Sequence, residues 1–166
     1  MSLTSAQLEV LKADMVADQA INSLPHNSDN AFAIASIYNQ PASPSFYIWR
    51  TSVSIDEIML NGFDWTRVDN LTVGKARIWE WMTALGSINP SQANVRAGVN
   101  ACFSASGDAA NRAAVYAHCQ REASRAEKLF STGTGTTTTD LGVGPAITSL
   151  LTTVDYSDVY AAWQLP

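Results

Sequence analysis

Two histidines and two cysteines are the residues whose types could ligate a metal or form a catalytic pair. His118 and Cys119 are adjacent, whereas His26 and Cys102 lie far from each other in the sequence. Adjacent positions on a helix point about 100° apart, so His118 and Cys119 cannot easily clasp one ion. A Cys–His nucleophile would also need an oxyanion hole and a third, orienting group, and no neighbouring motif supplies them. We therefore predict no metal site, no cofactor site and no catalytic residues.

A glycine-rich run and several carboxylates are weaker candidates for chemistry. The run Thr132-Gly-Thr-Gly-Thr lacks the preceding strand, the following helix and the lysine of a phosphate-binding loop. Asp56 with Glu57, or Asp64 with Asp69, could pair for acid–base catalysis. Glu57 is better explained as a helix cap, and the other carboxylates as solvated residues. The sequence thus predicts a protein that is not an enzyme.

Arginines and aromatic residues are instead candidates for contacts with a partner. Arg is the basic residue that is enriched at protein interfaces, although a solvated face with local ion pairs is the alternative explanation. Trp79 and Trp81 lie about 200° apart on one predicted helix, so they cannot both face the same core. The candidate interface residues are Trp49, Trp79, Arg112, Arg121, Arg125, Leu150, Leu151, Tyr156, Tyr160 and Trp163.

Composition and charge limit the function classes. Only 15% of the 166 residues are charged, against about 25% in an ordinary soluble protein, which favours surfaces that meet partners. The formal net charge of −5 argues against a sequence-specific nucleic-acid binder. No signal peptide and no membrane span are expected. Synthesis in a reducing cytoplasm favours two buried thiols, Cys102 and Cys119, over a disulfide.

Helix-start signals predict the elements that carry these residues. Thr4 with Gln7 and Ser54 with Glu57 form capping-box patterns, so helices are expected from Ser5 and from residue 55. Further helices are expected over 28–39, 73–85, 90–103 and 108–130, and an extended connector with a short strand over 41–53. On the helix over 73–85, the expected apolar stripe comprises Ile78, Trp81, Met82 and Leu85.

These elements predict a mainly α fold, a helical bundle of about five helices with an extended linker and a C-terminal docking tail. Residues 1–130 are expected to form the bundle, residues 131–146 a Thr/Gly-rich exposed linker, and residues 147–166 the docking segment. That segment is rich in apolar side chains, which would be buried on a neighbouring subunit. Folding back onto its own bundle is the alternative.

Four stretches carry a resemblance to a known family: Leu3-Thr-Ser-Ala-Gln-Leu, Trp49-Arg-Thr-Ser-Val, Gly62-Phe-Asp-Trp-Thr-Arg through Trp79-Glu-Trp-Met, and Arg125-Ala-Glu-Lys-Leu-Phe-Ser-Thr-Gly-Thr-Gly-Thr. Over residues 1–139 they resemble small proteins encoded among the head and neck genes of tailed bacteriophages. The resemblance implies a structural virion protein, and the head–tail adaptor, or connector, is the member of that class whose architecture matches best.

As an adaptor, the chain is expected to assemble with itself into a ring of about twelve copies. The ring would bind the portal protein and tail or neck proteins at the head–tail interface of the virion, after synthesis in the host cytoplasm. DNA would pass through it without specific contacts, and no membrane would be involved. The alternatives are a capsid decoration, minor capsid or tail protein, and, from another class, a small binding module or enzyme whose site forms only by tertiary contacts.

Overall fold

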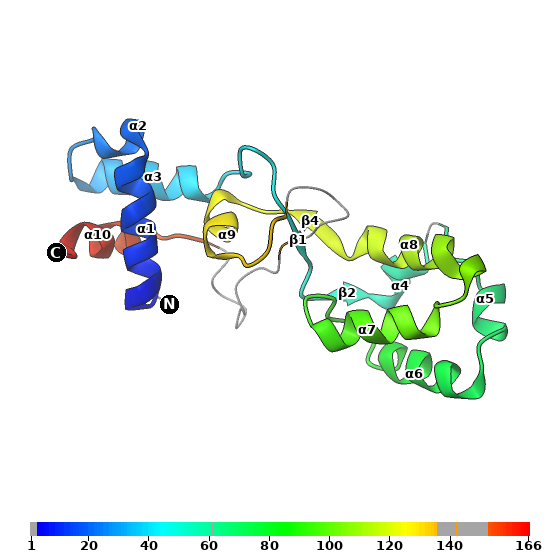
Figure 1. Cartoon of the computed structure of the whole chain (residues 1–166). Helices are drawn as coiled ribbons and strands as arrows, with labels where there is room; N and C mark the ends of the chain where they lie inside the picture. Colours follow the sequence, from blue (N-terminus) through cyan, green and yellow to red (C-terminus); the bar gives the residue numbers. More distant parts are fainter. Residues whose placement is uncertain (1–2, 61, 136–141, 143–152) are drawn as a thin grey trace. The chain divides into compact units, whose positions relative to one another are not determined.

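The chain folds into two compact units of mainly helical structure. The computed structural model describes residues 3–60, 62–135, 142 and 153–166 (Figure 1). Unit 1 comprises residues 1–47 and 122–166, and unit 2 comprises residues 48–121. The structure therefore divides the chain differently from the prediction, because the expected bundle over 1–130 is shared between two units and the C-terminal segment belongs to unit 1.

Unit 1 is built from α1 (Ser5–Ala17), α2 (Gln19–Asn22), α3 (Ser28–Asn39), α9 (Arg125–Phe130) and α10 (Tyr156–Gln164). The predicted capping box of Thr4 with Gln7 is confirmed at the start of α1. Asp18 ends α1 and caps α2, since its carboxylate accepts the backbone N–H groups of the residues that follow. Asn27 caps α3, since its side-chain oxygen accepts the Asn30 N–H.

The core of unit 1 lies between α1, α3 and α10, and α10 packs on both of the other helices (Figure 1). Leu11, Ile34, Tyr38 and Val159 are completely buried there. The backbone N–H of Leu3 donates to the Asp158 carboxylate, 2.9 Å away, which joins the first turn of α10 to the start of the described chain. The C-terminal helix thus packs on its own unit, the alternative that the sequence left open.

Unit 2 contains β2 (Val53–Ser54), α4 (Ile55–Ile58), α5 (Thr66–Asp69), α6 (Val73–Thr83), β3 (Ser87–Ile88), α7 (Ala93–Cys102), a 3-10 helix (Ser106–Asp108) and α8 (Ala109–His118). β2 pairs with β3 in antiparallel register. The capping box of Ser54 with Glu57 is confirmed. α6 packs on α7, and the rings of Phe63, Trp79 and Phe103 lie in contact in the core.

Two short strands, β1 (Tyr47–Trp49) and β4 (Gln120–Glu122), form a second two-stranded sheet. The boundary between the units falls within both strands. The strand expected within 41–53 is confirmed by β1, whose flanking Phe46 and central Ile48 are buried.

The helix expected over 108–130 is wrong, because α8 ends at His118 and a new helix begins at Arg125. Ser124 caps this second helix: its hydroxyl accepts the Glu127 N–H, and the Glu127 carboxylate accepts the Ser124 N–H. The same local bonds that start α9 therefore prevent one continuous helix. The expected start of α7 at Pro90 is also too early. The guanidinium of Arg96 donates to the Pro90 carbonyl at 2.7 Å, outside the helix.

The apolar stripe expected on α6 is confirmed in part, because Ile78 and Met82 pack against the core of unit 2 but Trp81 and Leu85 do not. Trp79 is 4% exposed and lies in the core, whereas Trp81 is 71% exposed and Leu85 79% exposed. The buried face of α6 is centred on Trp79 rather than on Trp81, because helical spacing separates two faces without saying which tryptophan lies towards α7.

The described part of the expected linker is not uniformly exposed. Residues 132–134 are exposed, but Gly135 is buried with φ +54°, and a Cβ there would lie 2.3 Å from the Phe46 ring. Tyr47 donates its N–H to the Gly135 carbonyl and accepts the Gly142 N–H. Residues 136–141 and 143–146 lie outside the described residues. Further along the chain, the backbone of Val154 forms two hydrogen bonds with the Asn39 side chain of α3, each of 2.9 Å.

Candidate functional site

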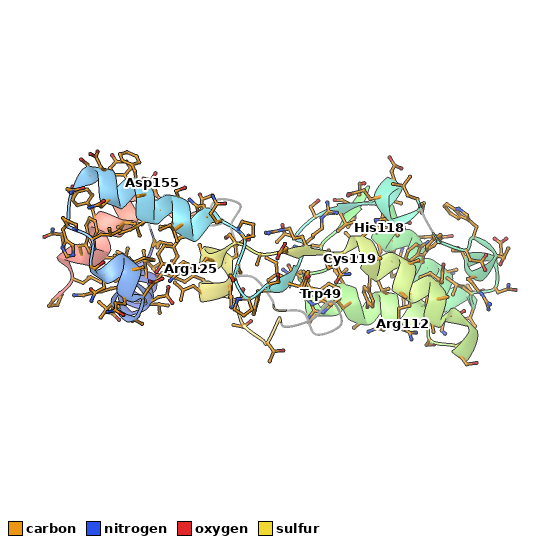
Figure 2. All side chains as sticks on the ribbon, turned by 90° about the horizontal axis from the view of Figure 1, so that it is seen from above. Trp49, Arg112, His118, Cys119, Arg125 and Asp155 are labelled. Atoms are coloured by element: carbon orange, nitrogen blue, oxygen red, sulfur yellow. The ribbon has the colours of Figure 1, made fainter. Side chains whose placement is uncertain are left out.

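Arg125, at the start of α9, is the centre of a charged cluster in unit 1. Its guanidinium donates to the Asp14 carboxylate of α1 and to the Asp18 carboxylate, each at 2.8 Å. It also lies 4.7 Å from the centre of the Tyr38 ring of α3. In Figure 2 Arg125 extends from α9 towards α1. The Arg125 side chain therefore links α9 to α1 and α3 within the same unit.

The other members of this cluster are fixed by the same bonds. The Tyr38 hydroxyl donates to Asp14 at 2.6 Å, and burial, with this carboxylate beside it, raises the pKa of Tyr38 far above its ordinary value. The hydrogen bond from Arg125 lowers the pKa of Asp18. The cluster borders a groove of about 670 Å³ that Lys128 also lines. Because the two carboxylates already share the guanidinium, the cluster is built to hold helices together.

Arg112 and Arg121, expected on the same helix as Arg125, lie in other elements. Arg112 of α8 donates to the Phe103 carbonyl, which follows the last turn of α7. Arg121 lies in β4 and is exposed, and it too takes part in an interaction. The three arginines therefore do not share one helix. Arg112 and Arg125 bind groups of their own unit.

Trp49 and Trp79, two further candidates for a partner interface, have different environments. Trp49 is half-buried, with its ring edge-on to Tyr116 at 5.3 Å and the Arg96 guanidinium 5.1 Å from its centre. Trp79 is enclosed in the core and is not available to a partner in this fold. The expectation that one of Trp79 and Trp81 leaves the core is confirmed, but the exposed residue is Trp81.

The aromatic residues of α10 make ring contacts within unit 1. Trp163 stacks on His26 with ring centres 4.3 Å apart, and Tyr160 meets it edge-on. Tyr156 remains exposed and stacks on the exposed Phe32 of α3 at 4.4 Å. Leu150 and Leu151, the remaining predicted interface residues, lie outside the described residues.

The strongest apolar exposure in unit 2 lies on α6 and just after it. Val73, Trp81 and Leu85 are exposed large apolar side chains, and α7 covers the opposite side of the helix. Trp81 and Leu85 were not among the candidate interface residues predicted from the sequence. The signal was the 200° separation of the two tryptophans, which marks one of them for solvent without identifying it.

The cysteines and the carboxylate that were considered for chemistry are buried or hydrogen-bonded within the fold. Cys102 and Cys119 are free and buried, and burial raises the pKa of both thiols, that of Cys119 to about 12. Arg50 bonds the Glu57 carboxylate at 2.8 Å and, with the Ser54 backbone N–H, lowers the pKa of Glu57 to about 2. Within the described ranges, no three His, Cys, Asp or Glu side chains converge as a metal site would require. No described helix has the length and apolar character of a membrane span.

Comparison of the chain with protein-family models, with curated proteins and with solved structures found no match in any of the three.

Proposed function

We propose that this chain is a structural subunit of a tailed-phage virion, a head–tail adaptor that works by assembling with copies of itself and with neighbouring virion proteins. The observation that supports an assembly role most directly is the pair of large apolar side chains exposed on α6 and just after it. Trp81 is 71% exposed and Leu85 79% exposed. Aromatic side chains of this kind are typical anchors of protein interfaces.

The low charge content supports the same proposal. A chain with 15% charged residues has fewer ionic groups to keep its surface solvated than an ordinary soluble protein. Contacts with other subunits would remove some of its apolar surface from water. The setting in a phage neck rests on the family resemblance of residues 1–139.

In the proposed assembly, about twelve copies close into a ring between the portal and the tail. With a formal charge of −5 per copy, twelve copies would carry roughly −60, which repels the DNA phosphates and lets DNA pass without sticking. The C-terminal helix would remain on its own unit, so portal contacts would come from exposed residues such as Phe32 and Tyr156, which stack on each other.

Copy number in the virion tests the proposal. Quantitative mass spectrometry of purified particles, calibrated against the major capsid protein, is expected to find about a dozen copies. Hundreds of copies would replace the adaptor with a decoration or minor capsid protein, and labelling along the tail would replace it with a tail protein. A particle that lacks the chain would overturn the virion role.

A further inference from the structure

The exposed face of α6 has an ordered pattern of charge and size. Arg77, Glu80, Trp81 and Ala84 are all exposed and stand at positions i, i+3, i+4 and i+7, which form one stripe of a helix. We call these four residues the α6 strip. Neither Arg77 nor Glu80 has an ion-pair partner within the described residues.

A groove in unit 1 has the complementary pattern. It has a volume of about 520 Å³ and is lined by Glu9, Lys12, Ala13, Val16, Leu165 and Pro166. The four α1 residues repeat the spacing i, i+3, i+4 and i+7 of the α6 strip. We call this depression the α1 groove.

Placed side by side in parallel, the two stripes match along their centre lines, where Arg77 would face Glu9 with opposite charge and Ala84 would leave room for Val16. The residues that flank each centre line cross over, because position i+4 of one helix faces position i+3 of the other. The indole of Trp81 would therefore lie against the aliphatic part of Lys12, and Glu80 beside the small Ala13. Lys12 is already held at the groove, because its ammonium donates to the Leu165 and Pro166 carbonyls at 2.6 and 2.9 Å.

We propose that the α6 strip of one copy docks in the α1 groove of a second copy. The inference rests on the proposed assembly role and adds the surfaces that carry it. Because the strip belongs to unit 2 and the groove to unit 1, each copy offers one of each. Such a contact between two different surfaces is heterologous, and it produces a ring when the rotation between copies closes.

The charges of the two units point to a second copy as the occupant. Unit 1 has three Lys and Arg residues against nine Asp and Glu, a formal charge of −6, whereas unit 2 has seven against six, a formal charge of +1. Contacts between unlike units therefore avoid the repulsion that two acidic units would have on each other.

Single substitutions on either surface test the contact in the full chain. Assembly is measured by sedimentation velocity over a range of concentrations. Trp81→Ala, Arg77→Glu and Glu9→Lys are each expected to weaken association by roughly tenfold or more, because they remove an anchor or place like charges opposite each other. Leu60→Ala is the matched control, since Leu60 is also exposed in unit 2 but lies outside the strip. It should leave association unchanged.

Mixing two variants separates a contact between copies from one within a chain. Arg77→Glu alone and Glu9→Lys alone are expected to stay dissociated, whereas an equimolar mixture should assemble, since every strip then meets a groove of opposite charge. No rescue on mixing would overturn the inference, because a contact within one chain gains nothing from a second variant. If the wild type assembles and none of the variants differs from Leu60→Ala, the inference fails and the assembly role stands. If the wild type never associates and is missing from virions, both the docking inference and the proposed assembly role are refuted.

Discussion

Replacing Arg125 by alanine should loosen unit 1, because one guanidinium binds two carboxylates and covers a ring. A charge-assisted hydrogen bond contributes about 1.5–3 kcal/mol when it is well buried. Asp14 and Asp18 have 33% and 28% of their side-chain surface exposed, so water replaces part of each bond and we assign about 1 kcal/mol to each. The contact with the Tyr38 ring adds about 0.5–1 kcal/mol. The expected loss is about 2–3 kcal/mol.

Hydrogen exchange followed by mass spectrometry measures this loss where it should occur. A loss of about 2–3 kcal/mol corresponds to roughly 30- to 160-fold faster exchange through opening of α1, α3 and α9. Arg125→Lys keeps the charge but not the two-pronged geometry, so it should give an intermediate result. Lys128→Ala, at an exposed bond to the Pro44 carbonyl, should change stability by less than about 0.5 kcal/mol.

The reasoning would be refuted by an Arg125→Ala variant that exchanges like the wild type. In that case the guanidinium would be free to bind a partner protein, as predicted from the sequence alone.

Three further predictions concern unit 2. Trp79→Ala should destabilise the protein by about 3–5 kcal/mol and Trp81→Ala by less than about 0.5 kcal/mol in urea unfolding; similar losses would contradict the assigned faces of α6. Because the pKa of Glu57 falls from about 4.5 unfolded to about 2 folded, its contribution is complete above pH 4.5 and disappears as the pH falls towards 2. The stability difference between wild type and Glu57→Gln should shrink over that window, and a constant difference would exclude the carboxylate as its cause. Cys102 and Cys119 should resist iodoacetamide at pH 8 in the native protein and react in urea, by mass spectrometry, because burial disfavours the thiolate; rapid native labelling would mean that the thiols are accessible.

Local signals in the sequence predicted much of the secondary structure. The capping boxes at Thr4 and Ser54 are formed by residues three apart, so they can be recognised without knowledge of the tertiary fold. The pattern of Ser124 with Glu127 is of the same kind, but it follows an alanine-rich run with strong helix propensity. Its consequence, a second helix in place of one long helix, could have been predicted from the sequence.

The features that could not be predicted from the sequence depend on contacts between residues that are far apart in the chain. Helical spacing places Trp79 and Trp81 on opposite faces, but the choice between them depends on how α6 packs against α7. Arg125 meets Asp14 across 111 residues of sequence, so its ion pairs could not be distinguished from a free basic face. The division into two units depends likewise on pairing between strands that are far apart in the chain.

The interrupted sequence of unit 1 has a consequence for synthesis on the ribosome. Unit 2 is one continuous stretch, so its core can close once residue 121 has emerged, whereas α1 and α3 must wait for the residues of α10 that cover them. During that interval buried side chains such as Leu11 and Ile34 remain exposed to water. Domains generally fold as units while the chain is being made, and we therefore expect the middle of this protein to be native before its beginning. The nascent chain would be most prone to aggregation, and most in need of a chaperone, between these two events.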